Sequence, residues 1–218
     1  MAEVSASILT VEKDNATQMF YDLEVAKINY FHIDVMDGKF VERDTTAVMK
    51  DYALTISHIS NLGLDVHLMV ENVEEFMDEY LMLEPEILTF HIEATKTEER
   101  TKNIIEQIKE NGTKVGISIS PDTSIDEIKP YLNQIHMVLV MTVVPGKGGQ
   151  KLIPETLDKV RELKKYIDDN GIDIDIEVDG GINAETAELA KEAGANILVA
   201  GNYLVSADNL KEAVQSLK

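Results

Sequence analysis

Histidine and aspartate residues recur where short β-branched runs end. The set consists of His32, Asp34, His67 and Asp179. Side chains two residues apart on a strand point to the same face, so His32 and Asp34 should lie side by side. If the runs are neighbouring parallel strands, all four side chains converge at one end of a sheet. Two imidazoles and two carboxylates suit a divalent metal ion, and two carboxylates suit an acid/base pair.

Glycine-rich turns form a second candidate set. Val144-Pro-Gly-Lys-Gly-Gly-Gln150 follows one apolar run, and Asp179-Gly-Gly181 and Gly201-Asn202 follow the next two. Glycine lets the backbone turn its amides toward an anion, and a helix N-terminus adds a favourable dipole. Three such turns at consecutive strand ends predict a cradle for a phosphate group.

Alternating strands and helices must position these groups. We expect strands at Val4–Leu9, Tyr30–Val35, Leu64–Met69, Ile87–His91, Lys114–Ile119, Met137–Met141, Ile174–Val178 and Ile197–Ala200. We expect helices near 13–27, 46–61, 73–83, 97–110, 124–132, 154–170, 184–193 and 208–217. Eight parallel βα units predict an α/β fold, a (β/α)8 TIM barrel that forms a single domain over residues 1–218.

An open doubly wound sheet is the rival fold. It would carry a glycine-rich phosphate turn directly after the first strand. Here the first strand ends in Ser7-Ile-Leu-Thr10, which has no glycine, and the glycine turns come late in the chain. A barrel carries phosphate sites in that late position. The barrel is therefore favoured.

Composition narrows the function further. The 218 residues carry a net charge of −20, from 40 acidic and 20 basic residues, so a nucleic-acid partner is not expected. The chain has no cysteine, which excludes disulfides and thiolate metal sites. The longest apolar run, Met137 to Val144, is too short to span a bilayer. No secretion signal is visible at the N-terminus, and the expected location is cytoplasmic.

Other residues near the predicted rim have more than one interpretation. Met36, Met69 and Met141 either pack the top of the barrel or form a dry lid over a charged intermediate. His91 and Glu93 are two apart at a strand end and could orient a metal-binding imidazole. His58 and His136 are expected to be ordinary surface histidines.

Four blocks of sequence resemble the ribulose-phosphate 3-epimerase family. They are His32-Ile-Asp-Val-Met-Asp-Gly-Lys-Phe-Val41, His67-Leu-Met-Val-Glu-Asn72, Met141-Thr-Val-Val-Pro-Gly-Lys-Gly-Gly-Gln150 and Ile176-Glu-Val-Asp-Gly-Gly-Ile-Asn183. Ser7-Ile-Leu9 and Val199-Ala-Gly201 also fit, so the resemblance covers the whole chain in order.

The resemblance implies a barrel that interconverts D-ribulose 5-phosphate and D-xylulose 5-phosphate. It implies one divalent metal ion, zinc or iron first and manganese or cobalt as alternatives. Carried over by position, the metal ligands are His32, Asp34, His67 and Asp179, and Asp34 and Asp179 are also the two acid/base groups. The substrate contacts would be Ser7, Met36, His67, Met69, Met141, Gly146, Lys147, Gly148, Gly149, Gly180, Gly181, Gly201 and Asn202.

This set suits inversion of a carbon next to a ketone. One carboxylate on each face can remove a proton from one side and return a proton to the other. The metal ion would stabilise the enediolate as a Lewis acid. The phosphorylated ketose would be the partner, and an exposed apolar helix face would leave room for a homo-oligomer.

The chain departs from the family pattern in its loops. Glu42-Arg43 replaces a usual Pro-Asn, which removes a rigid turn. Val144 replaces an acidic or amide residue, Lys147 replaces an aromatic residue, and Asn202 replaces a serine near the phosphate. Lys147 either contacts the phosphate or projects into solvent. These changes concern substrate identity and rate more than reaction type.

Three other functions are consistent with parts of the pattern. A 3-epimerase for a ketohexose phosphate, such as allulose 6-phosphate, needs the same acid/base set and more room around the sugar. A non-catalytic phosphosugar-binding protein would not require both Asp34 and Asp179. An aldolase or lyase would want a Schiff-base lysine on an inner strand face, and Lys114 starts its strand at the wrong end.

Overall fold

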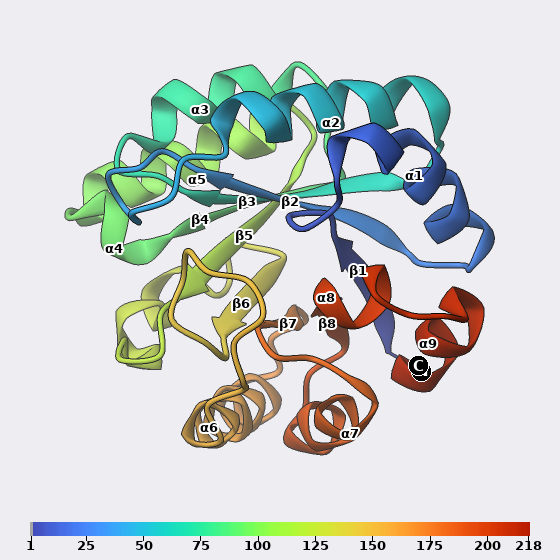
Figure 1. Cartoon of the computed structure of the whole chain (residues 1–218). Coiled ribbons are helices and arrows are strands. Elements are labelled where there is room, and N and C mark those ends of the chain that lie inside the picture. Colours follow the sequence, from blue (N-terminus) through green and yellow to red (C-terminus); the bar gives the residue numbers. More distant parts are fainter. Residues whose placement is uncertain (1) are drawn as a thin grey trace.

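The strands β1 to β8 close into a parallel barrel in the order of the chain (Figure 1). The computed structural model describes residues 2–218. Every neighbouring pair of strands is parallel, so all eight carboxyl ends meet at one rim. The predicted TIM barrel in a single domain is confirmed, and this rim is the place where such barrels carry their sites.

The strands follow the apolar runs closely. Their bounds are β1 Glu3–Ser7, β2 Tyr30–Met36, β3 Gly63–Met69, β4 Ile87–His91, β5 Lys114–Ile119, β6 Met137–Met141, β7 Asp175–Asp179 and β8 Ile197–Ala200. The bounds predicted for β4, β5, β6 and β8 are confirmed. The first strand ends at Ser7, before Leu9, and β7 includes Asp179 because that residue still pairs with Met141 of β6.

Helices surround the barrel on its outer side (Figure 1). Their bounds are α1 Ala16–Val25, α2 Thr46–Ile59, α3 Val73–Leu81, α4 Ile92–Thr95, α5 Glu98–Glu110, α6 Glu155–Asn170, α7 Ala184–Ala193, α8 Asn202–Val205 and α9 Leu210–Leu217. Three short 3₁₀ turns are η1 Lys13–Asn15, η2 Ile125–Glu127 and η3 Lys129–Tyr131. The buried faces of the longer helices pack on outward-facing strand residues such as Phe31 and Val66.

The helix predicted over 124–132 is wrong. The segment forms the two 3₁₀ turns η2 and η3. Pro130 lies at the start of η3, where it has no N–H to donate and disfavours α-helical geometry in the residue before it. Ser124 caps this segment, because its side chain accepts a hydrogen bond from the Asp126 amide. The four-residue helices α4 and α8 were not predicted, since one turn carries no helical periodicity.

An apolar plug fills part of the barrel interior. Ile87, Met137, Leu139, Met141, Val143 and Ile197 form this buried cluster. Polar residues occupy other inward positions, so the polar side chains of the interior lie together, apart from this apolar cluster and toward the rim. Among residues 2–218, no helix has the length and apolar content needed to cross a membrane.

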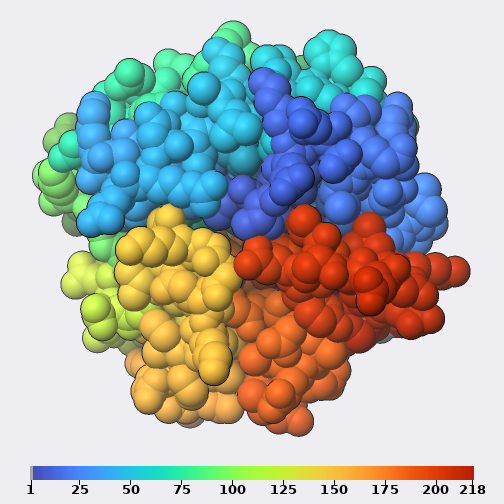
Figure 2. Space-filling model, viewed as in Figure 1, coloured from blue at the N-terminus to red at the C-terminus, as the bar shows by residue number. Residues whose placement is uncertain are grey.

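Figure 2 shows the surface in the same orientation. The yellow segment between β6 and α6 lies beside the red segment that follows β8. Loops far apart in sequence are therefore neighbours at this surface.

Candidate functional site

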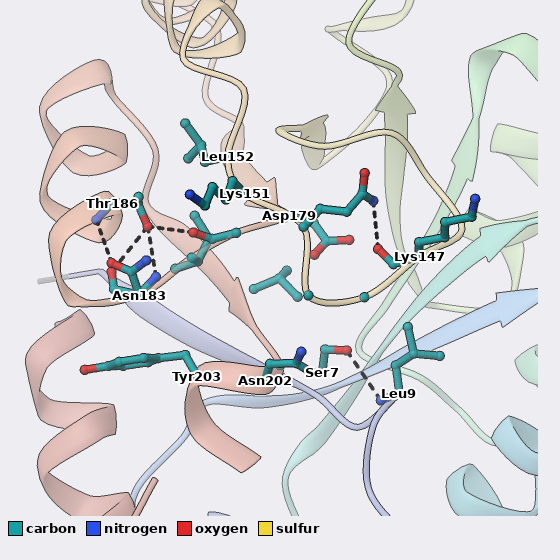
Figure 3. Close-up of a pocket in the computed structure, with 18 of the residues that line it drawn as sticks. Ser7, Leu9, Lys147, Lys151, Leu152, Asp179, Asn183, Thr186, Asn202 and Tyr203 are labelled. Carbon is teal, nitrogen blue, oxygen red and sulfur yellow. Dashed lines mark hydrogen bonds between the residues drawn. The ribbon is translucent and has the colours of Figure 1, made fainter. Parts of the chain in front are cut away.

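A cavity of about 630 Å³ opens where the carboxyl ends of the strands meet. Ser7, Asp34 and Asp179 contribute to its wall, together with the three glycine turns predicted from the sequence. Figure 3 shows Asp179 and Ser7 among the side chains that line it. Every predicted substrate-contacting residue lines this cavity except His67, which is fully buried.

The four predicted metal ligands form one cluster. One donor atom from each of His32, Asp34, His67 and Asp179 lies within 4.8 Å of the others. His32 Nε2 and His67 Nδ1 both lie 3.5 Å from Asp34 Oδ1. His67 Nδ1 also lies 3.8 Å from Asp179 Oδ2. The register of the barrel explains the cluster, because Asp34 of β2 pairs with His67 of β3.

The cluster fits a small divalent ion. His32 Nε2 and His67 Nδ1 are buried and have no hydrogen-bond partner within residues 2–218. Donors at about 2.0–2.2 Å from a tetrahedral ion stand about 3.3–3.6 Å from one another, close to the separations around Asp34. Nitrogen and carboxylate donors suit zinc, and imidazole also suits iron. These side chains therefore match a divalent metal site.

His32 is held by a second carboxylate below the cluster. Its Nδ1 donates to Asp65 Oδ2 over 2.6 Å, and Ser5 Oγ donates to the same oxygen over 2.7 Å. All three side chains are fully buried. Because Asp65 holds the proton on Nδ1, Nε2 is the ring nitrogen that faces Asp34 and is the one available to bind a metal ion.

His67 is held by a different pair of side chains. Its Nε2 lies 2.9 Å from His91 Nε2, and His91 Nδ1 lies 3.1 Å from Glu93 Oε2. Ser120 N and Thr123 Oγ1 donate to the other oxygen of Glu93. His67 and His91 are fully buried. The prediction that His91 and Glu93 lie behind a cluster histidine therefore agrees with the geometry.

The two aspartates of the cluster differ in acidity. Burial raises the pKa of Asp34, but attraction to His32 and then to His67, whose facing ring nitrogens both lie 3.5 Å from Asp34 Oδ1, outweighs burial and holds this pKa well below its usual range. Burial, followed by repulsion from Asp34, raises the pKa of Asp179 to about 7. A pair of carboxyl groups with separated pKa values is the pattern expected where one group holds a proton and the other accepts one.

The buried charge favours a positive partner at His32. Burial lowers the pKa of His32, yet attraction to Asp65 and Asp34 exceeds that effect and raises it well above its ordinary value. A proton and a metal ion compete for the same Nε2 lone pair, and both compensate the negative charge of the two carboxylates.

Glu177 lies in the interior beneath Asp179. It is fully buried, and neither carboxyl oxygen has a hydrogen-bond partner in the described part of the chain. Burial, then repulsion from Asp65, raises its pKa well above the usual range.

The glycine turns come together on the other side of the cavity. A Cβ added at Gly149 would meet Asn202 Nδ2 at 2.7 Å, and one added at Gly201 would meet Ser7 Cβ at 3.3 Å. At Gly181, with φ +69°, a Cβ would lie 2.3 Å from the backbone nitrogen of Leu152. Loops after the last strands of a barrel, with the N-terminus of a short helix such as α8, are a recurrent phosphate site.

The loop after β2 reaches over the rim despite its missing Pro-Asn. Asp37 holds it, because its Oδ1 accepts from the amides of Lys39 and Phe40. The Phe40 ring packs on His91 with centroids 4.8 Å apart, and Val41 lies against Gly146. Hydrogen bonds within the loop thus replace the rigid turn that the sequence departure removes.

The remaining candidates occupy distinct positions. Met36, Met69 and Met141 are buried and line the cavity, which agrees with both interpretations of them. Lys147 is exposed at the cavity edge, and its side chain extends away from Asp179 in Figure 3. His58 and His136 are exposed, as predicted.

Sequence reasoning missed Asp65 and Glu177. Each stands two residues before a predicted ligand, His67 and Asp179 respectively, and therefore on the same strand face. The same two-residue spacing that singled out His32 and Asp34 would have found them. The contacts of Phe40 and Val41 had no comparable signal, because they join separate loops.

Comparison with known proteins agrees with this geometry. The model of the Ribulose-phosphate 3 epimerase family matches residues 3–205. The ribulose-phosphate 3-epimerase of Methanocaldococcus jannaschii is 42% identical over 218 residues, covering 100% of this chain and 90% of that protein. The ribulose-phosphate 3-epimerase of Bacillus subtilis is 38% identical over 219 residues, covering 100% of this chain and 99% of that protein.

Solved structures share the fold at low identity. A 3-keto-L-gulonate-6-phosphate decarboxylase from Vibrio cholerae superposes with a TM-score of 0.74 at 13% identity, covering 100% of this chain and 96% of that one. A 3-hexulose-6-phosphate synthase superposes with a TM-score of 0.73 at 11% identity, covering 99% and 97%. At such identities the likeness concerns the barrel alone.

Proposed function

Because the chain belongs to the ribulose-phosphate 3-epimerase family, we propose that it inverts C3 of a ketopentose phosphate with the help of one divalent metal ion. The reaction interconverts D-ribulose 5-phosphate and D-xylulose 5-phosphate. The observation that carries the proposal is the pair of carboxylates, Asp34 and Asp179, in one buried donor cluster at the wall of a cavity.

In the proposed mechanism, the two aspartates work on opposite faces of the substrate carbon. One carboxylate takes the C3 proton, and the carboxyl group of the other donates a proton to the opposite face. The reverse reaction exchanges their roles. Ser7 Oγ donates to Asp34 Oδ2 over 2.7 Å and so orients this carboxylate toward the cavity.

His32, Asp34, His67 and Asp179 would hold the metal ion. When bound, the ion supplies Lewis-acid stabilisation of the negative charge that develops on the substrate oxygens. Met36, Met69 and Met141 exclude water beside the reacting carbon, which strengthens electrostatic interactions there.

We assign the phosphate to the glycine turns, and Gly181→Ala tests this. The new Cβ would lie 2.3 Å from Leu152 N at a φ of +69°, so the turn must move. Since a strained non-glycine residue costs about 1–3 kcal/mol, we expect KM for the phosphorylated ketose to rise at least about tenfold. Steady-state kinetics measures the change.

Gly171→Ala is the matched control. Gly171 has a similar φ of +62° at the end of α6, but no heavy atom lies within 4 Å of a Cβ added there. This variant should lose a little stability and keep its KM. An unchanged KM in Gly171→Ala together with an unchanged KM in Gly181→Ala would contradict the assignment of the phosphate to this turn.

The choice of substrate is tested by a direct comparison. We expect kcat/KM of the purified protein to be at least about tenfold higher for D-ribulose 5-phosphate than for D-allulose 6-phosphate. A tenfold ratio corresponds to about 1.4 kcal/mol of transition-state binding. Coupled assays of both ketose phosphates at the same metal content measure the ratio. A preference for the six-carbon sugar would replace the pentose assignment with the hexose one.

Two further predictions concern the cellular location of the protein and its oligomeric state. A cytoplasmic location is proposed from the sequence, and self-association into a homo-oligomer is proposed from its apolar surface. Tyr21, Val25, Met82 and Leu189 are among the exposed large apolar residues.

A further inference from the structure

His67 joins the metal cluster to a series of hydrogen bonds that leads away from the cavity, through His91 to Glu93. The chain runs from His67 Nε2 to His91 Nε2 over 2.9 Å, and from His91 Nδ1 to Glu93 Oε2 over 3.1 Å. The opposite nitrogen, His67 Nδ1, is the one that faces Asp34 and Asp179. Whatever sets the proton on Nε2 therefore decides whether Nδ1 is free to bind a metal ion.

A hydrogen bond between two imidazoles has no direction of its own. Either nitrogen can be the donor, and reversing the bond moves the proton of each ring to its other nitrogen. A group at the end of the chain must choose the direction. Glu93 can do so because its Oε1 already accepts from Ser120 N, over 2.8 Å, and from Thr123 Oγ1, which leaves Oε2 as an acceptor for His91.

With Glu93 as acceptor, the tautomers of His91 and His67 are both fixed. His91 donates from Nδ1 and accepts at Nε2, so His67 donates from Nε2 and keeps a lone pair on Nδ1. The Phe40 ring covers His91 at 4.8 Å between centroids, and both histidines are fully buried, so the two imidazoles are shielded from solvent.

We propose that Glu93 is a positioning residue that, through His91, selects the His67 tautomer able to bind the divalent ion. The inference rests on the proposed metal site and adds to it a residue outside the donor cluster. Outer carboxylates that orient a ligand imidazole typically contribute 10- to 100-fold to metal affinity.

Glu93→Gln is the decisive variant, because it keeps the shape and reverses the polarity. The amide oxygen would occupy the Oε1 position, where two donors require an acceptor, and the NH₂ group would face His91 Nδ1. His91 would then donate from Nε2, and His67 would carry its proton on Nδ1. We expect the Zn²⁺ affinity, measured by chelator competition, to fall 10- to 100-fold.

Two further variants separate polarity from charge. Glu93→Ala leaves His91 without a directing partner, so its Zn²⁺ affinity should fall less than that of Glu93→Gln. Glu127 is exposed and lines the same second surface pocket as Glu93, so Glu127→Gln removes the same charge nearby and should leave the affinity unchanged. An equal loss in Glu93→Gln and Glu127→Gln, or a larger loss in Glu93→Ala than in Glu93→Gln, would overturn the proposal.

A second measurement is independent of the metal and of turnover. In the metal-free chain labelled with ¹⁵N-histidine, the His67 shifts should report a proton on Nε2 in the unmodified protein and on Nδ1 in Glu93→Gln. The same tautomer in both would refute the role of Glu93. If the unmodified chain binds no Zn²⁺, the proposed metal site fails, while this measurement still decides what Glu93 does.

Discussion

Asp34→Asn and Asp179→Asn should each lower kcat by at least about 10³-fold while the barrel stays folded. General acid–base groups contribute about 10²–10⁴-fold, and each aspartate here also supplies a donor to the metal cluster. An amide neither accepts the C3 proton nor returns one. Steady-state kinetics measures the loss, and thermal unfolding checks the fold.

Exchange of the C3 proton with deuterated water sharpens this prediction. Any residual exchange should be one-sided: the variant at Asp34 should exchange only one epimer, and the variant at Asp179 only the other. Asp173→Asn is the control, because Asp173 is exposed ahead of β7 at the opposite end of the strand. Turnover near the unmodified rate in either site variant would refute the two-base assignment.

Removing the metal ion should lower activity by at least about 10²-fold, with recovery on adding back one divalent ion per chain. Lewis-acid stabilisation supplies several kcal/mol, and each 1.36 kcal/mol is about tenfold in rate. To test this, a chelator removes the metal, elemental analysis verifies its removal, and activity is measured during titration with Zn²⁺, Fe²⁺, Mn²⁺ and Co²⁺. Full activity in a chain shown by elemental analysis to be free of metal would contradict it.

His67→Gln tests the metal requirement by removing one of the proposed ligands. His67 Nδ1 is buried with no hydrogen-bond partner among residues 2–218, so its loss should remove both metal and activity. His58→Gln changes an exposed histidine on α2 and should alter neither. Equal metal content in the two variants would mean that His67 is not a ligand.

Much of the site followed from local spacing along single strands. A strand alternates its side chains between two faces, so His32 and Asp34 had to share a face once their run was recognised as β. The capping box at Asn183 and the left-handed Gly171 likewise follow from short-range chemistry, and both are present in the structure. The helix expected over 124–132 is wrong for a local reason too, since Pro130 opposes α-helical geometry in the middle of that segment.

Contacts between distant segments were not predictable in this way. Phe40 packs on His91, and Val41 lies against Gly146, only because loops after different strands meet over the rim. The direction of the hydrogen-bond chain through His91 also depends on Ser120 and Thr123, which the fold brings to Glu93 from the segment after β5. No spacing in the sequence encodes these pairings.

The sequence by itself determined the residue types, the strand faces that carry them and the class of barrel, because alternation and βα order are short-range properties. Only the tertiary structure decided that His32, His67, Asp34 and Asp179 form one cluster, and which nitrogen of each histidine faces it. The physical reason is the closure of the barrel. Closure sets the register between β2, β3 and the distant β7. It also buries the metal-binding atoms of the cluster, and a buried polar atom needs a partner.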